Sequence, residues 1–392
     1  MKLELSPAQK TLRRELRTYF RDLMTPERVA ATKGIEGGPV FREIVRQMGA
    51  DGVLTLGWPT EYGGEGRGMI DQLILFEETW VARAPFPVVT ISTIAPALMQ
   101  FGTAEQKAKY LPGIAAGEMV FAIGYSEPGA GTDLAALKTS ADYANGTFTV
   151  NGTKVYTSGA DGADYIWLAA RTDKGAEPPH TGISVMIADC TDPGFSLAPI
   201  RTVAGLRTNV TYYDNVKVAE ADLVGGLNNG WNIIRSQLNH ERISLAAMSI
   251  NGVRAFLDAL SETRTVNGTN QRPIDNPLIQ QQAAEIYVRL EAMSQLNWRM
   301  AWQIDNDCVD HALASGVKVF STVELVEVMR RIADLYGATA SIHGEGPASV
   351  QHGYVDEILR MAQLNTFGGG AAEVMRSMVA AMGLGMPNTI SR

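Results

Sequence analysis

Apolar side chains recur at helical spacing through the first part of the chain. Ser6 and Pro7 form a typical helix start, because serine caps the first turn and proline fits its first position. Apolar residues then return every three or four positions, at Leu12, Leu16, Tyr19, Phe20 and Leu23. The same periodicity predicts further helices at 40–48, 69–81 and 91–101. We therefore expect a helical N-terminal domain over residues 1–117, with a glycine-rich turn at 58–66.

The pattern changes near Met119 to short clusters of β-forming residues. They lie at 147–150, 154–157, 165–168, 183–187 and 210–213. Asn-Gly, Asp-Gly and Pro-Gly pairs separate these clusters, and such pairs mark hairpins and turns. The clusters predict a small β-barrel or sandwich over residues 118–224.

Helical periodicity returns after Gly225 and continues through the rest of the chain. The predicted helices span 231–264, 277–305, 310–336 and 355–382. Helices of this length pack side by side, so we expect a four-helix bundle over residues 225–392. The fold class is therefore expected to be α+β, with helical, β and helical domains in that order.

Composition and charge exclude several functional classes. The 34 basic and 42 acidic residues give a net charge of -8, which is unfavourable for nucleic-acid binding. Cys190 and Cys308 stand far apart without a CxxC pair, so neither a disulfide framework nor a metal site is expected. The N-terminus has no apolar signal core, and no apolar run approaches the ~20 residues that a membrane helix needs. We expect a cytoplasmic enzyme without membrane insertion.

Two segments of the β region combine hydrogen-bond donors with glycine or an aromatic ring. The loop 123–133 exposes main-chain N–H groups at its glycines and adds the hydroxyls of Ser126 and Thr132, which suits an electron-rich ring or a phosphate. A hairpin loop that needs glycine explains the same residues. Further along, Tyr156 can cover one face of a flat cofactor while Ser158 bonds its edge. An ordinary strand with a half-buried tyrosine is the alternative.

A carboxylate stands within an apolar stripe of the predicted helix 231–264. The stripe comprises Ile234, Leu238, Glu241, Leu245, Met248 and Gly252. A buried carboxylate is costly unless it is paired or stays neutral with a raised pKa. In such a pocket Glu241 is suited to removing a proton from carbon. A buried ion pair with Arg242 or His240 is the alternative.

Taken together, these segments resemble the acyl-CoA dehydrogenase family over essentially the whole chain. Tyr-Ser-Glu-Pro-Gly-Ala-Gly-Thr-Asp at 125–133 is similar to the family's flavin loop. Asn-Gly-Thr-Lys-Val-Tyr-Thr-Ser at 151–158 is similar to the strand that touches the flavin, with tyrosine in place of the usual tryptophan. Segments 205–211 and 216–218 resemble a further signature of the central β-barrel. The resemblance implies FAD, bound by Ile123, Tyr125, Ser126, Gly131, Thr132, Tyr156, Thr157 and Ser158.

The resemblance also implies the position of the catalytic base. Family members carry it either before a glycine near the C-terminus or on the first long C-terminal helix. Here glycine stands at the first position, Gly368 or Gly369, while Asn-His-Glu-Arg at 239–242 fits the second. Glu241 is thus implied to take the α-proton of an acyl-CoA thioester while hydride passes from the β-carbon to flavin N5. The implied substrate contacts are Thr132, Asn239 and Arg242.

Three departures from the family pattern point to a partner subunit. In homotetrameric members a neighbour contacts the ADP half of FAD through an Arg-x-x-Phe-Gly motif, a His-Gln pair and a Gln-x-x-Gly-Gly turn. Here the corresponding residues at 264–273, 276–277 and 341–346 read differently. We therefore expect an α2β2 heterotetramer in which a homologous subunit donates these contacts, as in the steroid-side-chain acyl-CoA dehydrogenases that the chain resembles. Sequence drift with compensating contacts is the alternative.

The expected substrate is a bulky or branched CoA thioester, because a base on the earlier helix and glycines at 368–370 leave room near the α- and β-carbons. The resemblance favours a steroid side chain. The resemblance implies an electron-transfer flavoprotein as the electron acceptor. Two other functions share these motifs. One is an acyl-CoA oxidase, which passes the electrons to oxygen, and the other is a non-catalytic scaffolding subunit of such a complex.

Overall fold

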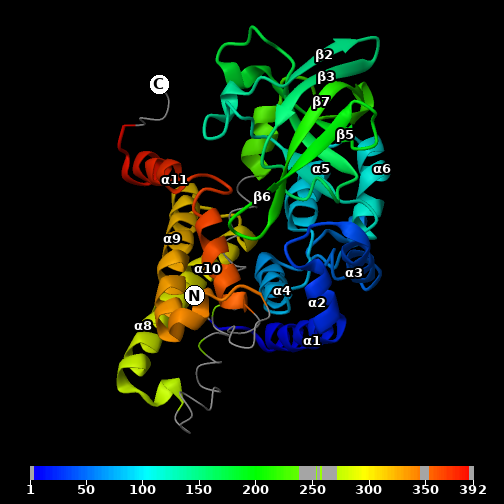
Figure 1. The fold of residues 1–392 in the computed structure, drawn as a ribbon. Coiled ribbons are helices and arrows are strands. Elements are labelled where there is room, and N and C mark those ends of the chain that lie inside the picture. The colour runs from blue at the N-terminus through cyan, green and yellow to red at the C-terminus, as the bar shows by residue number, and fades with distance from the viewer. Residues whose placement is uncertain (1–3, 238–252, 254–256, 258–271, 345–352, 388–392) are drawn as a thin grey trace.

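Three parts of the chain pack together in the order that the sequence predicts. Figure 1 shows the strands above the N-terminal helices, with the C-terminal helices beside them. The computed structural model describes residues 4–237, 253, 257, 272–344 and 353–387. Within these residues, no helix is long and apolar enough to cross a membrane, and no group of histidine, cysteine or acidic side chains is arranged to hold a metal ion.

The N-terminal part is helical, as predicted. Its helices are α1 (Pro7–Leu23), α2 (Pro26–Thr32), α3 (Gly38–Ala50), α4 (Met69–Val81), α5 (Ala95–Phe101) and α6 (Ala104–Ala115). Ser6 caps α1, because its hydroxyl accepts the Gln9 N–H while the Gln9 side chain accepts the Ser6 N–H. The apolar stripe of α1 is buried, except that Tyr19 is half-buried. The helix predicted at 91–101 begins as a π-helical turn, η2 (Val89–Ile94), before α5.

Eight strands form one sheet after α6. They are β1 (Phe121–Gly124), β2 (Ser140–Ala144), β3 (Thr147–Lys154), β4 (Tyr165–Arg171), β5 (Ile183–Asp189), β6 (Phe195–Arg201), β7 (Arg207–Ala219) and β8 (Leu223–Val224). Hydrogen bonds connect them in the order β6-β7-β3-β2-β4-β5-β8, and β1 lies parallel to β4. Phe148, Val150 and Ile166 belong to the apolar core of this domain. The expected central β domain is confirmed, but the strand predicted at 154–157 is wrong, because β3 ends at Lys154.

The C-terminal part is again helical. Its helices are α8 (Pro277–Asp305), α9 (His311–Tyr336), α10 (Tyr354–Leu364) and α11 (Ala372–Met378), and the π-helical η9 (Val379–Gly383) follows. The single helix predicted at 355–382 is wrong, since α10 and α11 are separated by a turn. In this turn Gly369 and Gly370 have φ values of 66° and 113°, which a helix cannot accommodate. Residues 230–237 are helical, while most of the helix predicted at 231–264 lies outside the described residues.

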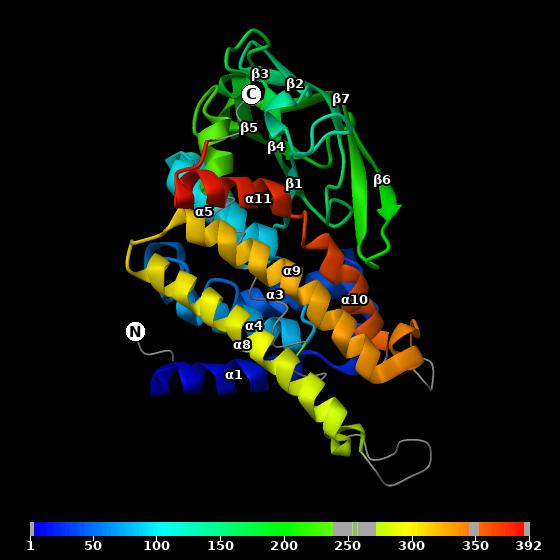
Figure 2. The same ribbon diagram turned by 90° about the vertical axis from the view of Figure 1, so that its left-hand side faces the viewer.

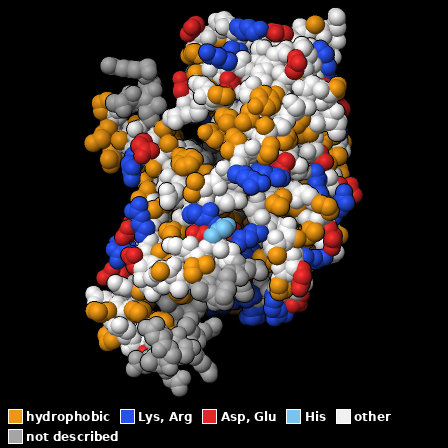
Figure 3. Space-filling view, in the orientation of Figure 1, with side chains coloured by type: hydrophobic (Ala, Val, Ile, Leu, Met, Phe, Trp, Pro, Cys, Tyr) orange, Lys and Arg blue, Asp and Glu red, His pale blue; other side chains and the backbone are white. Residues whose placement is uncertain are grey.

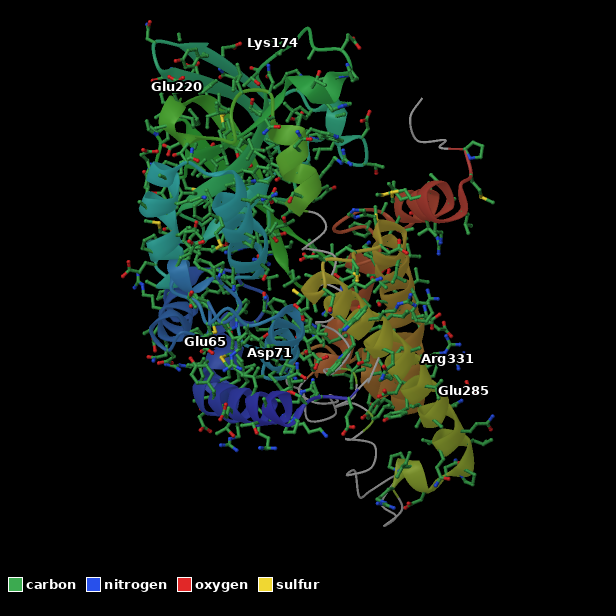
Figure 4. The ribbon with its side chains drawn as sticks, turned by 180° about the vertical axis from the view of Figure 1, so that it is seen from behind. Glu65, Asp71, Lys174, Glu220, Glu285 and Arg331 are labelled. Carbon is green, nitrogen blue, oxygen red and sulfur yellow. The ribbon has the colours of Figure 1, made fainter. Side chains whose placement is uncertain are left out.

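One apolar core joins the three parts. It contains residues of the N-terminal helices, Trp167 of β4, and Val317 of α9. Helices α8 and α9 run side by side, as Figure 2 shows, and Figure 4 shows Glu285 of α8 and Arg331 of α9 on their outer face. These two side chains form an ion pair at 2.7 Å. Because core residues are shared, the sheet and the C-terminal helices form a continuous framework for the segments between them.

Candidate active site

The segment after β1 is held against the first helix of the C-terminal part. The Tyr125 hydroxyl donates to Oε1 of Gln237. The Trp167 indole N–H lies 3.1 Å from that hydroxyl oxygen and 3.2 Å from the same Oε1. Trp167 and Gln237 are buried, so their hydrogen bonds are made to protein rather than to water. Ile123 pairs with Trp167 between β1 and β4, and this network therefore fixes the end of β1 relative to residues 230–237.

A main-chain hydrogen bond brings the two predicted cofactor segments together. The Val155 N–H donates to the Ser126 carbonyl at 2.9 Å. The loop after β1 consequently runs beside the residues that follow β3. Ser126 is half-buried at this junction, whereas Gly131 and Thr132 are exposed further along the same loop. The structure therefore places Ser126 next to the second segment and leaves Gly131 and Thr132 open to a ligand.

Tyr156 departs from strand geometry. Its φ of 61° lies in the left-handed region, and the residue is 68% exposed. A non-glycine residue in such a sparsely populated conformation costs about 1–3 kcal/mol and persists only where its surroundings enforce it. The interpretation as an ordinary strand with a half-buried tyrosine is wrong, because this residue follows the end of β3 and its ring is open to solvent. An exposed ring of this kind offers a face on which a flat molecule can stack.

Asn209 on β7 holds the residues that follow Tyr156. Its Nδ2 donates to the Thr157 carbonyl at 3.1 Å, and its own carbonyl accepts the Thr157 N–H at 3.0 Å. Thr157 is fully buried, while Ser158 is exposed and its hydroxyl donates to Oγ1 of Thr208 at 3.2 Å. Thr157 thus anchors the segment, and its two neighbours face outward.

A buried ion pair supports the loop from inside the domain. Nζ of Lys154 donates to Oε1 of Glu127 at 2.8 Å and to the Tyr125 carbonyl at 3.0 Å. Glu127 also accepts the N–H groups of Lys138 and Thr139, at 2.6 and 2.8 Å. Burial lowers the pKa of Lys154 to about 8, although the charge of Glu127 opposes this shift. Burial also opposes ionisation of Glu127, but the Lys154 charge and the donors around it hold the pKa of Glu127 below its usual range.

The arrangement fits a flat ring that accepts and donates hydrogen bonds. Tyr156 and Ser158 are exposed beside the Ser126 main chain. Among the described residues, the buried atoms Nε2 of Gln237 and Oδ1 of Asn209 find no hydrogen-bond partner. Unpaired buried polar atoms are rare in proteins, and a bound ligand or a water molecule would satisfy them. Figure 3 shows apolar side chains gathered on the β domain beside a hollow toward the C-terminal helices.

Comparison with known proteins identifies the family to which this chain belongs. Models of the N-terminal, middle and C-terminal domains of acyl-CoA dehydrogenases match residues 6–118, 122–216 and 228–384. The chain belongs to the acyl-CoA dehydrogenase family. It is 42% identical over 398 aligned residues to the acyl-CoA dehydrogenase FadE26 of Mycobacterium tuberculosis, and the alignment covers 99% of each chain.

Two solved structures are similar to this acyl-CoA dehydrogenase over almost their full length. One is a chain of the Tcur3481-Tcur3483 steroid ACAD, with 45% identity, a TM-score of 0.94, and 99% and 100% of the two chains covered. The other comes from the ChsE4-ChsE5 complex of Mycobacterium tuberculosis, with 43% identity, a TM-score of 0.91 and the same coverage. The expected fold class and enzyme class are confirmed, and members of this family generally bind FAD.

Three predicted site residues of the acyl-CoA dehydrogenase lie outside the described residues. They are Asn239, Glu241 and Arg242, whose roles stay predictions. The nearest described residue is Gln237, four positions before Glu241. In the helix predicted from the sequence, residues four apart are neighbours on one face.

Sequence analysis missed three residues that build the site. Lys154 had a signal, because alternation from Phe148 and Val150 points it inward, where a lysine requires a partner. Gln237 had a weaker signal, since it lies next to the apolar stripe of the predicted helix 231–264 that contains Glu241 but is not part of that stripe. Asn209 had only its place in the signature at 205–211, because its role depends on a contact with a residue 52 positions away.

Proposed function

We propose that this acyl-CoA dehydrogenase binds FAD and introduces a double bond between the α- and β-carbons of an acyl-CoA thioester. The hydrogen bond from Val155 to Ser126 carries the proposal, because it holds both segments of the family's flavin site side by side at the exposed Tyr156. FAD, when bound, supplies the hydride acceptor. The residues proposed to line it are Ile123, Tyr125, Ser126, Gly131, Thr132, Tyr156, Thr157 and Ser158. Electrons then pass to an electron-transfer flavoprotein in the cytoplasm.

Glu241 is the proposed base that removes the α-proton. A carboxylate within an apolar stripe has a raised proton affinity, which suits abstraction from carbon. The described part of its helix supports this placement, because Gln237 contacts the loop after β1 through the Tyr125 hydroxyl. Negative charge that develops on the thioester oxygen needs fixed hydrogen-bond donors. The exposed Thr132 is one proposed contact of the substrate, and Asn239 and Arg242 are the others.

The proposed substrate carries a bulky acyl group, with a steroid side chain favoured. The turn between α10 and α11 has no side chains at Gly368, Gly369 and Gly370, where many relatives carry a catalytic glutamate. A Cβ atom built on Gly368 meets only the Leu364 carbonyl oxygen, at 3.4 Å, so the outer side of this glycine is open. The Tcur3481-Tcur3483 protein, 45% identical to this chain, is named a steroid ACAD.

The proposed assembly is an α2β2 heterotetramer with a homologous subunit. Both similar structures are named as pairs of proteins, Tcur3481-Tcur3483 and ChsE4-ChsE5. Large apolar residues are exposed on and after the C-terminal helices: Leu278, Tyr287, Val288, Trp302, Leu384 and Met386. Two of the departures from the homotetramer pattern have local roles in this chain. Asn276 caps α8 by accepting the Leu278 N–H, and His343 contacts Asp356 at 3.0 Å.

The test is reduction of bound flavin by a steroid-side-chain CoA thioester. The chain is purified with its partner subunit, and the flavin absorbance is followed after mixing with the thioester under anaerobic conditions. We expect the wild type to bleach, and Glu241→Gln to retain FAD but bleach about 10²- to 10⁴-fold more slowly, in line with loss of a general base. The exposed Glu118→Gln serves as the matched control and should bleach at the wild-type rate.

Each other outcome contradicts a defined part of the proposal. Retained FAD with equal bleaching in Glu241→Gln rejects Glu241 as the base. Bound FAD that no steroid thioester bleaches, but a shorter acyl-CoA does, rejects the substrate preference. Rapid reoxidation of the reduced flavin by oxygen identifies an oxidase. A complex that binds no FAD supports the alternative function as a scaffolding subunit. A homotetramer of this chain with FAD in every site contradicts the proposed partner subunit.

A further inference from the structure

Lys154 is enclosed at the centre of the candidate site without reaching its surface. The side chain is fully buried, and its ammonium group bonds Glu127 on one side and the Tyr125 carbonyl on the other. A lysine in the interior requires a counter-charge, and Glu127 provides it. The bond to the Tyr125 carbonyl satisfies a second N–H of the ammonium group and couples its charge to the peptide between Tyr125 and Ser126.

The Tyr125 carbonyl and the Ser126 N–H belong to the same peptide group. A cation that binds the carbonyl oxygen draws electron density toward it and makes the N–H of that peptide a stronger donor, because linked hydrogen bonds polarise one another. Among the described residues, the Ser126 N–H has no acceptor, while the Ser126 carbonyl accepts the Val155 N–H. The polarised N–H is therefore held in place and available to a ligand.

We propose that Lys154 is a positioning residue of the redox reaction, which strengthens the Ser126 N–H as a hydrogen-bond donor to the flavin. This inference rests on the proposed function, in which the Ser126 main chain contacts the isoalloxazine ring. Transfer of a hydride adds two electrons to that ring, and a stronger donor stabilises the more electron-rich reduced form. Lys154 acts through the peptide bond and touches neither the substrate nor the cofactor.

Two substitutions remove the charge of the buried Lys154 in different ways. Glutamine keeps an N–H donor on a side chain that is one atom shorter, whereas methionine has nearly the length of lysine and removes both the charge and the hydrogen bond. Glu127 keeps two other donors, the N–H groups of Lys138 and Thr139. The Lys138 side chain is exposed near the same loop, so Lys138→Gln is a matched control that changes the net charge equally.

The experiment measures the two-electron midpoint potential of the bound flavin in the complex with the partner subunit. For Lys154→Gln we expect the affinity for reduced relative to oxidised flavin to fall about tenfold, which lowers the potential by about 30 mV. Lys154→Met should show at least the same fall, and Lys138→Gln should keep the wild-type potential. Glu127 and Arg171 are the charged groups that influence Lys154, whose pKa is about 8. The difference between wild type and Lys154→Gln should therefore shrink well above pH 8.

A structural role alone predicts a different result. Lys154→Gln would then keep the wild-type potential at every pH, and Lys154→Met would lose FAD without a change of potential in the flavin that remains. Either finding overturns the inference. If neither variant retains flavin, the pH dependence of the wild-type potential decides. A decrease near pH 8 that exceeds the ordinary decrease of a flavin potential with pH supports the inference, and its absence overturns it. A wild-type complex that binds no flavin contradicts the proposed function instead.

Discussion

Replacing Asn209 by alanine tests whether the left-handed Tyr156 belongs to the cofactor site. The Asn209 side chain donates to the Thr157 carbonyl at 3.1 Å and to Oδ1 of Asp161 at 3.2 Å, and the residue is fully buried. Alanine removes both bonds but keeps the main-chain bond to Thr157. Each lost bond contributes about 1 kcal/mol. The strain at Tyr156 acts in the same direction, because a less firmly held segment relaxes toward ordinary backbone geometry.

Loss of the two hydrogen bonds of Asn209 should cause a large change in FAD affinity. If FAD binding must restore the native conformation of the segment, it has to supply the lost stabilisation of about 2 kcal/mol. The affinity then weakens by about thirty-fold, since 1.4 kcal/mol is a factor of ten. The affinity is measured by titrating FAD into flavin-free complex and following flavin fluorescence. Asn232→Ala is the control, because Asn232 is exposed and, within the part of the chain that the structure describes, its side chain bonds only Asn229.

One result would refute the reasoning about Asn209. The variant could lose thermal stability and yet bind FAD as tightly as the wild type. The bonds of Asn209 would then stabilise the β domain without shaping the cofactor site, and the left-handed conformation of Tyr156 would be unrelated to FAD binding. Equal losses of affinity in Asn209→Ala and Asn232→Ala would likewise remove the special role of the buried residue.

Three further predictions concern contacts around the site. Gln237→Leu removes the acceptor shared by Tyr125 and Trp167, so we expect a loss of about 1–3 kcal/mol in unfolding free energy and slower flavin bleaching, measured by urea unfolding and stopped-flow absorbance. Glu127→Gln should make the unfolding free energy less dependent on pH in the acid range. The pKa of Glu127 is lowered from 4.5, so its contribution to stability is present above pH 4.5 and is lost as the pH falls further. Urea unfolding at several pH values across that range measures this dependence. Asp305→Ala removes the acceptor of two N–H groups at the start of α4 and should cost about 1 kcal/mol, without a change in flavin potential.

The arrangement of helices and strands could be predicted from periodicity, because burial of one face repeats along each element. Ser6 and the stripe of α1 show this, since the cap and the buried side chains lie where the sequence predicts. Failures occur where glycine or a left-handed residue interrupts a regular pattern. The helix predicted across Gly369 and Gly370 is broken, and β3 stops two residues before Tyr156. Periodicity detects which residues face inward but not where the backbone leaves its regular geometry.

The candidate site was predictable in its segments but not in its supports. Ser126 and Tyr156 could be named because family motifs are local in sequence. Their relative placement depends on contacts between distant residues, such as the one from Trp167 to Gln237 over 70 positions. No local pattern encodes a pair of this kind. The inward position of Lys154 was readable from alternation, but its bond to the Tyr125 carbonyl was not.

Each proposed cofactor segment is thus fixed by a different part of the chain. The loop after β1 is tied to the helix at 230–237 through Tyr125, and to β3 through Lys154. The segment at Tyr156 is tied to β7 through Asn209. Because glycine restricts the backbone little, the N–H donors of the loop depend on these distant contacts as well as on the local main-chain bonds between Glu127 and Ala130. Affinity for the flavin should therefore follow the integrity of the β domain and its contact with the helix, more than the composition of the loop that touches the ring.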